Sequence, residues 1–295
     1  MDRRSFLLSA AALLAARWSE GARAAPLSMP LAFDDGRRPL VQTRINGRGP
    51  YAFVLDTAAQ QVGLGPRVVA DARLTPDGRE AMLHGAAGAA RVPLYTLATV
   101  ELETLRLENV TALELRHTAG DEHGHDGILS PAVFGAARLT FEYPARRLTI
   151  DRSPDRTAGE ADLPVDILHN VFVIAPAQVQ GVAVRAVIDT GARHSMANDR
   201  LREALGFAPQ DPRFKRTSRV GGATGQSLEL SWTSVAGVAI GGLRLTNLEL
   251  PFAAAPVFAA LGLAGVPAII VGADILHASA RFGIDYASRR FSIAP

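Results

Sequence analysis

Short apolar runs separated by turn residues recur along this chain of 295 residues. The segment 40–56 alternates apolar and polar positions on both sides of Asn46-Gly47, and this pattern predicts a β-hairpin. The segment 171–189 has the same pattern around a turn near Gly181. We therefore expect much of the chain to form short strands joined by tight turns.

Helical periodicity is restricted to brief segments. Residues 67–74 and 197–207 have helical spacing, and the second segment places Leu201 and Leu205 on one face. The sequence therefore predicts an all-β fold with a few short helices.

The apolar pattern occurs twice, in the same order. Each predicted hairpin ends in an apolar triplet that is followed by an acid and a threonine, Asp56-Thr57 and Asp189-Thr190. Beyond each acid lie a Gly-rich segment, an apolar segment sharing L-R-L-x-N, a short apolar run, and a tail with a tyrosine and two arginines. These matched segments are 84–94 and 220–230, 100–110 and 238–248, 126–134 and 268–276, and 141–150 and 284–293. Such self-similarity predicts an internal duplication that builds two similar lobes.

A polar segment that contains proline and glycine separates the two copies. It covers roughly residues 151–166. We therefore expect a first lobe over residues 28–152, a linker over 153–166 and a second lobe over 167–295.

The first 24 residues do not fit the strand pattern. Arg3-Arg4 precedes a short apolar stretch, and Ala22-Arg23-Ala24 forms an A-x-A cleavage site. These features predict a signal peptide of the twin-arginine type over residues 1–24 and an exported protein, periplasmic or secreted. The alternative interpretation is an amphipathic N-terminal helix.

Charge and composition exclude several classes of protein. The formal net charge is only +2 and the arginines are scattered, so nucleic acid is not an expected partner. The sequence has no cysteine, which excludes disulfides, thiolate catalysis, cysteine-ligated metals and lipid attachment at an N-terminal cysteine.

The run between Glu249 and Asp274 carries no charge and is long enough to suggest a membrane span. It contains three prolines and much alanine, however. We therefore expect a buried loop, a short helix and a strand, and no transmembrane helix in the mature protein.

The duplicated acids suggest a chemistry. A carboxylate at the edge of an apolar core is costly unless it is paired or hydrogen-bonded. If the lobes pack about a pseudo-twofold axis, Asp56 and Asp189 face each other, and such a pair shares one proton over a mildly acidic range. The pair can then act as general base and general acid on a water and a carbonyl group. Thr57 and Thr190 can donate hydroxyls across the lobe junction.

These residues resemble the retropepsin-like aspartic proteases, in a single-chain, two-lobed version with the plan of pepsin and of an exported bacterial type. The second lobe carries the family pattern in V-I-D-T-G-A at 187–192 and in Ile270-Val271-Gly272. The resemblance covers roughly residues 30–295. It implies two homologous β-barrel lobes with an active-site cleft between them.

The resemblance also implies roles for individual residues. Asp56 and Asp189 would be catalytic, supported by loop residues Thr57, Ala58, Thr190 and Gly191. Flaps would form around Gly85, Gly88, Gly221 and Gly222. The expected enzyme is a monomeric endopeptidase that hydrolyses extended peptides or proteins and needs no metal or cofactor beyond a water.

Two residues of the first lobe depart from the family pattern. Ala58 and Ser130 stand where glycine is usual. They favour an alternative function, a catalytically weak or inactive peptide-binding protein on the same scaffold. A third possibility, a structural β-protein with accidental motifs, predicts that no cleft separates the lobes.

Several other polar residues suggest sites. The segment 121–127 contains His123 and His125, which can bind Zn²⁺ weakly, but a polar turn before a buried strand is the favoured interpretation. His84 and His194 are each expected in exposed or partly exposed loops, although either can lie at a cleft. Glu142 and Asp285 occupy matched positions and are expected to be strand-end carboxylates near the arginines that follow them.

Overall fold

The structure is a computed structural model that describes residues 25–116, 125–153, 162–208 and 210–295. The predicted signal peptide, His123 and most of the predicted linker lie outside these residues.

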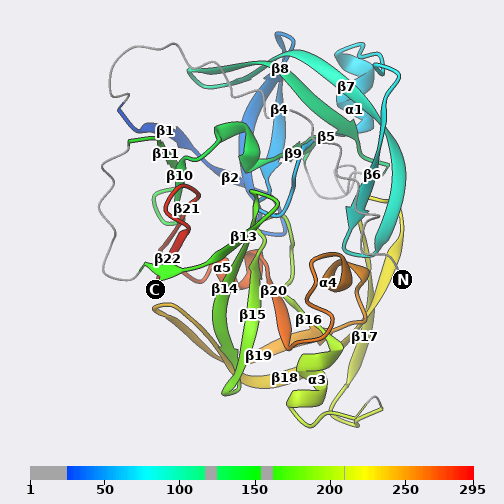
Figure 1. Cartoon of the computed structure of the whole chain (residues 1–295), viewed down its shortest axis with the longest axis vertical. Coiled ribbons are helices and arrows are strands. Elements are labelled where there is room, and N and C mark those ends of the chain that lie inside the picture. The colour runs from blue at the N-terminus through cyan, green and yellow to red at the C-terminus, as the bar shows by residue number, and fades with distance from the viewer. Residues whose placement is uncertain (1–24, 117–124, 154–161, 209) are drawn as a thin grey trace.

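An eight-stranded sheet forms the first lobe, shown in blue, cyan and green in the upper part of Figure 1. Pairing between β3 and β7 closes six of its strands into a barrel, with β2 and β6 added at the two ends. In sheet order the strands are β2 (Ala32–Phe33), β3 (Pro39–Ile45), β4 (Arg48–Leu55), β9 (Gly127–Leu129), β5 (Val62–Leu64), β8 (Leu105–Glu114), β7 (Gly88–Leu102) and β6 (Glu80–Gly85).

The second lobe repeats this topology. Pairing between β14 and β18 closes its barrel, which lies in the lower part of Figure 1. Its strands, in sheet order, are β13 (Asp166–Leu168), β14 (Phe172–Val179), β15 (Val182–Ile188), β20 (Ala268–Val271), β16 (Met196–Ala197), β19 (Leu243–Phe252), β18 (Ser227–Ile240) and β17 (Arg216–Gly221). The predicted all-β class with two homologous barrel lobes is therefore confirmed.

A six-stranded sheet joins the lobes. It runs in the order β1 (Leu27–Pro30), β11 (Arg147–Asp151), β10 (Arg138–Glu142), β21 (Arg281–Asp285), β22 (Arg290–Ala294) and β12 (Leu163–Pro164). Antiparallel pairing of β10 with β21 places Thr140 opposite Gly283, and these two residues occupy the same position in the two copies of the repeat. The pseudo-twofold axis therefore passes through this pair.

The apolar core continues from one lobe to the other through this sheet. Strand β3 has the burial pattern expected of alternating positions, because its apolar side chains point into the barrel and Gln42 and Arg44 point outward. At the lobe boundary the rings of Phe141 and Phe282 stack with their centroids 4.4 Å apart. Full burial of such a side chain contributes roughly 1.5–3 kcal/mol, so the lobes share stabilising contacts.

Helices are short, as predicted. The segment 67–74 contains most of α1 (Pro66–Asp71), and 197–207 contains α3 (Asp199–Ala204). Residue Asn198 caps α3 by accepting the backbone N–H of Leu201. Among the residues that the structure describes, the other helices are the 3₁₀ helix η1 (Pro131–Phe134), α4 (Pro256–Ala260) and α5 (Ala273–Leu276).

The uncharged run between Glu249 and Asp274 forms the end of β19, a loop, α4 and β20, as the sequence predicts. In the described part of the chain, every helix is too short or too polar to span a bilayer.

Candidate active site

Each duplicated acid follows the last residue of a central strand. β4 runs parallel to β9, and the backbone N–H of Asp56 donates to the carbonyl of Leu129 at 3.0 Å. The second lobe repeats this arrangement, since the N–H of Asp189 donates to the carbonyl of Val271 at 3.0 Å. A buried parallel strand therefore holds each acidic loop in place.

Two threonines connect the loops across the lobe junction, and both are fully buried. The Thr57 hydroxyl donates to the carbonyl of Ile188 at 2.8 Å and accepts the backbone N–H of Thr190 at 3.0 Å. The Thr190 hydroxyl does the same in reverse, with the carbonyl of Leu55 and the N–H of Thr57. These reciprocal bonds bring Asp56 and Asp189 close together at the lobe junction.

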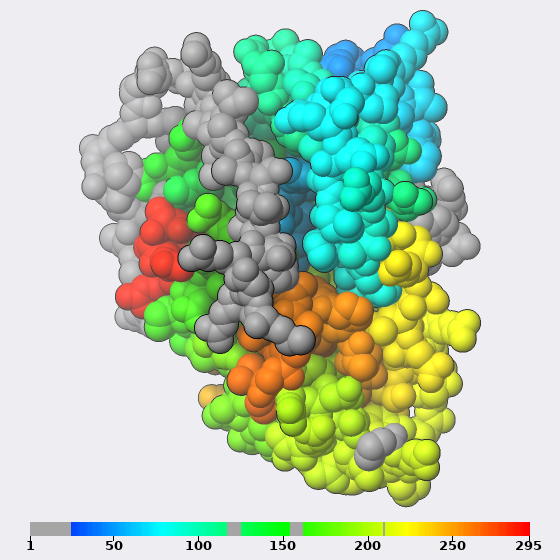
Figure 2. Space-filling model, turned by 45° about the vertical axis from the view of Figure 1, so that its right-hand side comes forward, coloured from blue at the N-terminus to red at the C-terminus, as the bar shows by residue number. Residues whose placement is uncertain are grey.

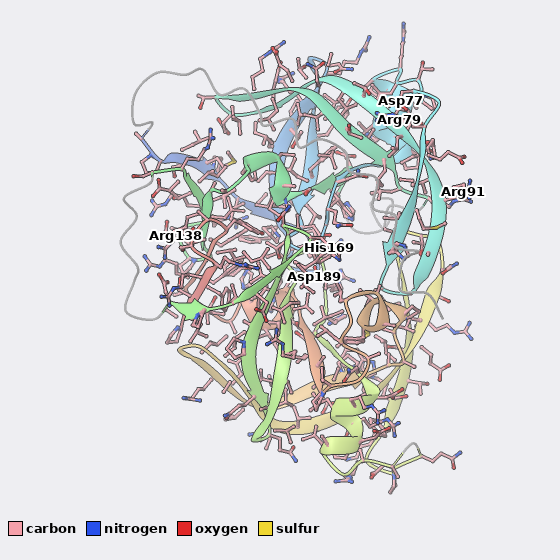
Figure 3. All side chains as sticks on the ribbon, viewed as in Figure 1. Asp77, Arg79, Arg91, Arg138, His169 and Asp189 are labelled. Atoms are coloured by element: carbon pink, nitrogen blue, oxygen red, sulfur yellow. The ribbon has the colours of Figure 1, made fainter. Side chains whose placement is uncertain are left out.

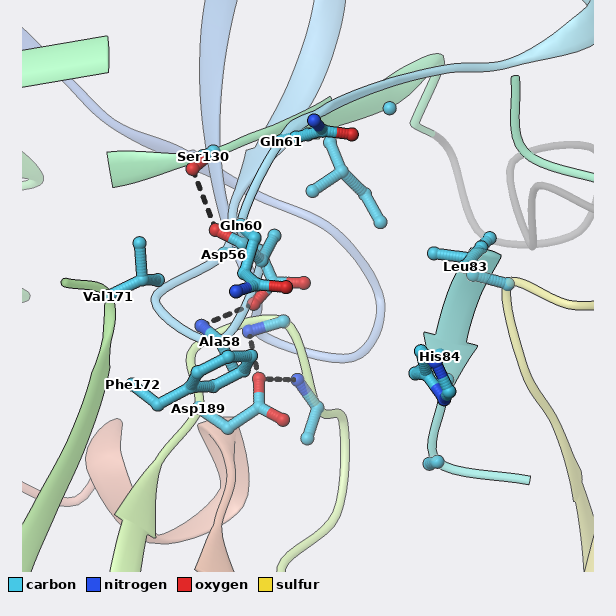
Figure 4. Close-up of a pocket in the computed structure, with 18 of the residues that line it drawn as sticks. Asp56, Ala58, Gln60, Gln61, Leu83, His84, Ser130, Val171, Phe172 and Asp189 are labelled. Carbon is cyan, nitrogen blue, oxygen red and sulfur yellow. Dashed lines mark hydrogen bonds between the residues drawn. The ribbon is translucent and has the colours of Figure 1, made fainter. Parts of the chain in front are cut away.

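The two acids meet at the base of a cleft between the lobes. Their carboxyl groups lie close enough that each shifts the pKa of the other. Backbone N–H groups hold both carboxyls, because Asp56 Oδ1 accepts Ala58 N at 2.8 Å, and Asp189 Oδ1 accepts Gly191 N and Ala192 N, each at 2.9 Å (Figure 4). Figure 3 shows Asp189 near the middle of the molecule.

The electrostatics of this pair are unequal. Burial raises the pKa of the Asp189 carboxyl well above its ordinary value, and the negative charge of Asp56 raises it further. Burial also raises the pKa of Asp56, but the Ala58 N–H, the Arg38 guanidinium and the hydrogen bond from Asp189 oppose that increase. The shared proton therefore belongs on Asp189, and Asp56 is the ionised partner.

Residue Arg38 also affects the pKa of Asp56, although no sequence motif identified it. Its side chain is largely buried, with Nε donating to Asp34 Oδ2 at 2.7 Å and Nη1 donating to the Gly191 carbonyl at 3.5 Å. It thus connects a first-lobe loop to the second acidic loop. Tyr286 was missed as well, although the negative charge of Asp56 contributes, after burial, to raising the pKa of its phenol.

The two departures from the glycine pattern are accommodated. At position 191 glycine is required, because a Cβ there would lie 2.3 Å from Asp56 Cγ. Its first-lobe counterpart, Ala58, carries a methyl group and still donates its N–H to Asp56.

The hydroxyl of Ser130 makes a hydrogen bond that a backbone N–H makes at the equivalent place in the second lobe. Its buried hydroxyl donates to the Ala59 carbonyl at 2.7 Å and accepts the N–H of Ala132 at 3.1 Å, which caps η1. In the second lobe the matching carbonyl, that of Ala192, accepts the N–H of Ala273 at 2.8 Å instead.

Two hairpins extend over the cleft, and we call them the first flap (β6–β7, residues 80–94) and the second flap (β17–β18, residues 216–230). Predicted flap residues Gly85 and Gly88 lie at the first tip, where they pair with each other, and Gly221 and Gly222 lie at the second. In Figure 2 the cyan first flap reaches the orange and yellow second lobe.

The flap tips touch each other. Gln226 Nε2 donates to the Ala89 carbonyl at 3.3 Å. A Cβ placed on Gly222 would lie 3.5 Å from the Ala87 Cβ. Thr224, in the second tip, is only 4% exposed and contacts Gly85. The tips therefore close the cleft on the side opposite the acids.

The resulting cleft has a volume of about 2170 Å³ and is lined by both lobes. Figure 4 shows Leu83 and His84 of the first flap facing the acids across it, with Val171 and Phe172 on the side of the acids. A structural β-protein with accidental motifs was expected to lack such a cleft, so that interpretation is wrong.

The remaining candidate residues are placed as follows. His84 is exposed, as expected, but it lies on strand β6 and not in a loop. His194 is a half-exposed loop residue that lines the cleft. His125 is buried just before β9, and burial lowers its pKa to about 4. Across the residues that the structure describes, we find no cluster of side chains able to hold a metal ion.

The matched carboxylates are not a second acid pair. Glu142 Oε2 accepts Arg147 Nε at 2.7 Å, as the sequence predicts. Asp285 is buried at the end of β21, where it pairs in register with Arg290 and accepts the N–H of Ser288.

Comparison with known families agrees with this geometry. A model of the aspartyl protease family matches residues 41–131 and 175–275, one segment in each lobe. No curated protein matches the chain significantly. The two matched segments include both acids, the cores of both barrels and both flaps, and the chain belongs to the aspartyl protease family.

Proposed function

We propose that the protein is an exported aspartic endopeptidase that hydrolyses peptide bonds with a water activated by Asp56 and Asp189. The observation that carries the proposal is the close approach of the two buried carboxyls at the base of the cleft, where reciprocal threonine hydrogen bonds hold their loops together. Membership of the aspartyl protease family supports it. Both acids belong to one chain, so a monomer is sufficient for activity.

The unequal pair suggests the order of proton transfers. Ionised Asp56 takes a proton from water while the water oxygen attacks the peptide carbonyl carbon. Protonated Asp189 gives its proton to the carbonyl oxygen, which forms a neutral tetrahedral diol. Asp56 then protonates the amide nitrogen, Asp189 takes back a proton from the diol, and the carbon–nitrogen bond breaks. The pair ends with one proton, as it began.

The flaps favour an extended peptide as substrate. An extended chain can form backbone hydrogen bonds with flap strands while its side chains occupy pockets on alternating sides. Closure of the tips excludes bulk water from the acids. This chemistry needs no metal or cofactor. The segment 1–24 supports an exported, periplasmic or secreted location.

The test is peptide cleavage by the purified mature chain and by the variants D56N and D189N. We expect pepstatin-sensitive cleavage in the wild type, and a decrease in kcat by a factor of about 10² to 10⁴ in each variant without unfolding. Full activity in either variant contradicts the proposed mechanism. Tight peptide binding by the wild type without turnover between about pH 3 and pH 8 indicates the peptide-binding alternative instead.

A further inference from the structure

Two arginines and a histidine of the second lobe line the cleft near the acids, and one of them, Arg193, packs against Gly36 of the first lobe. Arg193 lies four residues after Asp189, Arg216 begins β17, and both line the cleft with His194. Neither arginine forms an ion pair within 4.0 Å with a carboxylate of the described residues. The Arg216 guanidinium and the His194 ring both contact Trp232, and His194 Nδ1 lies 3.9 Å from Asp274 Oδ2. Burial lowers the pKa of His194, the negative charge of Asp274 opposes that decrease, and the charges of Arg193 and Arg216 add to it.

The Arg216 guanidinium is held in one orientation by Trp232. Its Cζ lies 4.1 Å from the centroid of the indole ring. Trp232 is buried, donates Nε1–H to Ser218 Oγ at 2.7 Å, and contacts the His194 ring edge-to-face at 5.4 Å. A stacked guanidinium keeps its in-plane N–H donors free for a carboxylate. Arg216 is therefore a preorganised hydrogen-bond donor for an anionic group of a ligand.

The loop that carries Arg193 and His194 is also fixed. Ser195, which follows them, is buried and donates its hydroxyl to Asp274 at 2.6 Å. The same hydroxyl accepts the N–H of Gly272 at 2.9 Å, and the N–H of Ser195 donates to Asp274. A ligand that contacts this loop therefore does not have to order its backbone on binding.

This charge pattern does not follow the pseudo-twofold symmetry. Arg216 lies five residues before Gly221, and the equivalent residue of the first flap, five before Gly85, is Glu80. Glu80 forms an ion pair with Arg91 at 3.4 Å. Figure 3 shows Arg91 on the first flap, well separated from Asp189. Among the described residues that line the cleft, Arg38 and Arg91 of the first lobe are paired with acids, whereas Arg193 and Arg216 of the second lobe form no ion pair with a described carboxylate.

We propose, on the basis of the proposed function, that Arg193, His194 and Arg216 form a subsite for the carboxylate of a substrate aspartate or glutamate close to the scissile bond. Since a charged hydrogen-bonded pair is worth more than one order of magnitude in affinity, the subsite selects acidic peptides and sets their direction in the cleft.

The test uses quenched fluorescent peptides in matched pairs that differ only by glutamate or glutamine at one position, scanned across the cleavage site. We expect the glutamate peptide to have at least a tenfold higher kcat/KM at one position. R216Q and R193Q should each reduce this ratio towards one, and R216E should favour lysine there. The control R244Q removes an exposed arginine of β19 that does not line the cleft.

The ratio separates this inference from the proposed function. Cleavage with equal rates for glutamate and glutamine at every position overturns the subsite and leaves the endopeptidase intact. If no peptide is cleaved, fluorescence anisotropy of labelled peptides on the D189N variant still tests the subsite. Preferred binding of the glutamate peptide, lost on adding R216Q but not R244Q, supports the subsite without protease activity. Equal binding of both peptides overturns it.

Discussion

The hydroxyl of Thr57 bonds to the backbone of the second lobe, and the hydroxyl of Thr190 bonds to the backbone of the first, so that each threonine completes the other's loop. Both side chains are buried, and no water can replace them without opening the junction. The position of the two carboxyls therefore depends on two hydroxyl groups that have no role in proton transfer.

Replacing Thr190 by valine should be costly despite the similar shape of the side chains. The variant leaves the carbonyl of Leu55 and the N–H of Thr57 without a partner, and each unsatisfied buried group costs about 1–3 kcal/mol. Urea denaturation should show the decrease in the free energy of unfolding. T246V, on the exposed face of β19, is the control. Equal stability of the two variants would contradict this account.

Replacing Asp189 by asparagine should reduce kcat by a factor of about 10² to 10⁴ but stabilise the fold. Burial and the charge of Asp56 raise the pKa of Asp189 in the folded state, so the folded protein binds a proton that the unfolded chain releases. That stabilisation is complete below the ordinary aspartate pKa and is lost as the pH rises through the raised pKa. Asparagine cannot ionise and avoids this loss.

The difference in stability between D189N and wild type should therefore grow as the pH rises through that window and then stay constant. Thermal unfolding at several pH values measures it, with the exposed D35N as a control for the loss of one carboxylate. A D189N variant that is less stable than wild type at pH 7 would show that the proton does not belong to Asp189.

Exchange of Ser130 and Gly272, which occupy equivalent positions, should harm the protein in both directions. S130G restores the family residue but leaves the Ala59 carbonyl and the Ala132 N–H without the hydroxyl, at a cost of about 1–3 kcal/mol. G272S places a Cβ 2.8 Å from the Ala192 carbonyl oxygen and the His194 carbonyl carbon. Such overpacking costs about 1–3 kcal/mol and displaces the Asp189 loop.

Urea denaturation of the two single variants measures these costs. If S130G were more stable or more active than wild type, Ser130 would be a defect of the first lobe. Reduced stability would show that its hydroxyl is a working replacement for the second-lobe contact.

The sequence was sufficient to predict the features that repeat. The two copies placed Asp56, Asp189 and the glycine-rich tips in equivalent positions, and local alternation predicted the hairpins that carry them. The hydrogen bonding of Ser130 could not be predicted, because its hydroxyl donates to a carbonyl 71 residues away in sequence. Such a partner depends on how strands pack and not on local pattern.

Arg38 was missed for the same reason. Its loop has no motif, and its positive charge acts on Asp56 only because the fold brings the guanidinium to the lobe junction, where it also donates to the Gly191 carbonyl. The pairing of Thr140 with Gly283 and the contact between the flap tips are likewise visible only once both lobes are assembled.

The contact between the flap tips can be converted into a covalent lock. A Cβ on Gly222 would lie 3.5 Å from that of Ala87, a separation compatible with a disulfide, and the chain has no cysteine of its own to interfere. Oxidised A87C/G222C should lose turnover of an unfolded protein substrate, because an extended chain reaches the acids only after the tips separate. Dithiothreitol should restore turnover, while each single cysteine variant should respond to neither treatment. Full turnover by the cross-linked enzyme, verified as oxidised by mass spectrometry, would show that substrate enters along the cleft beneath closed flaps.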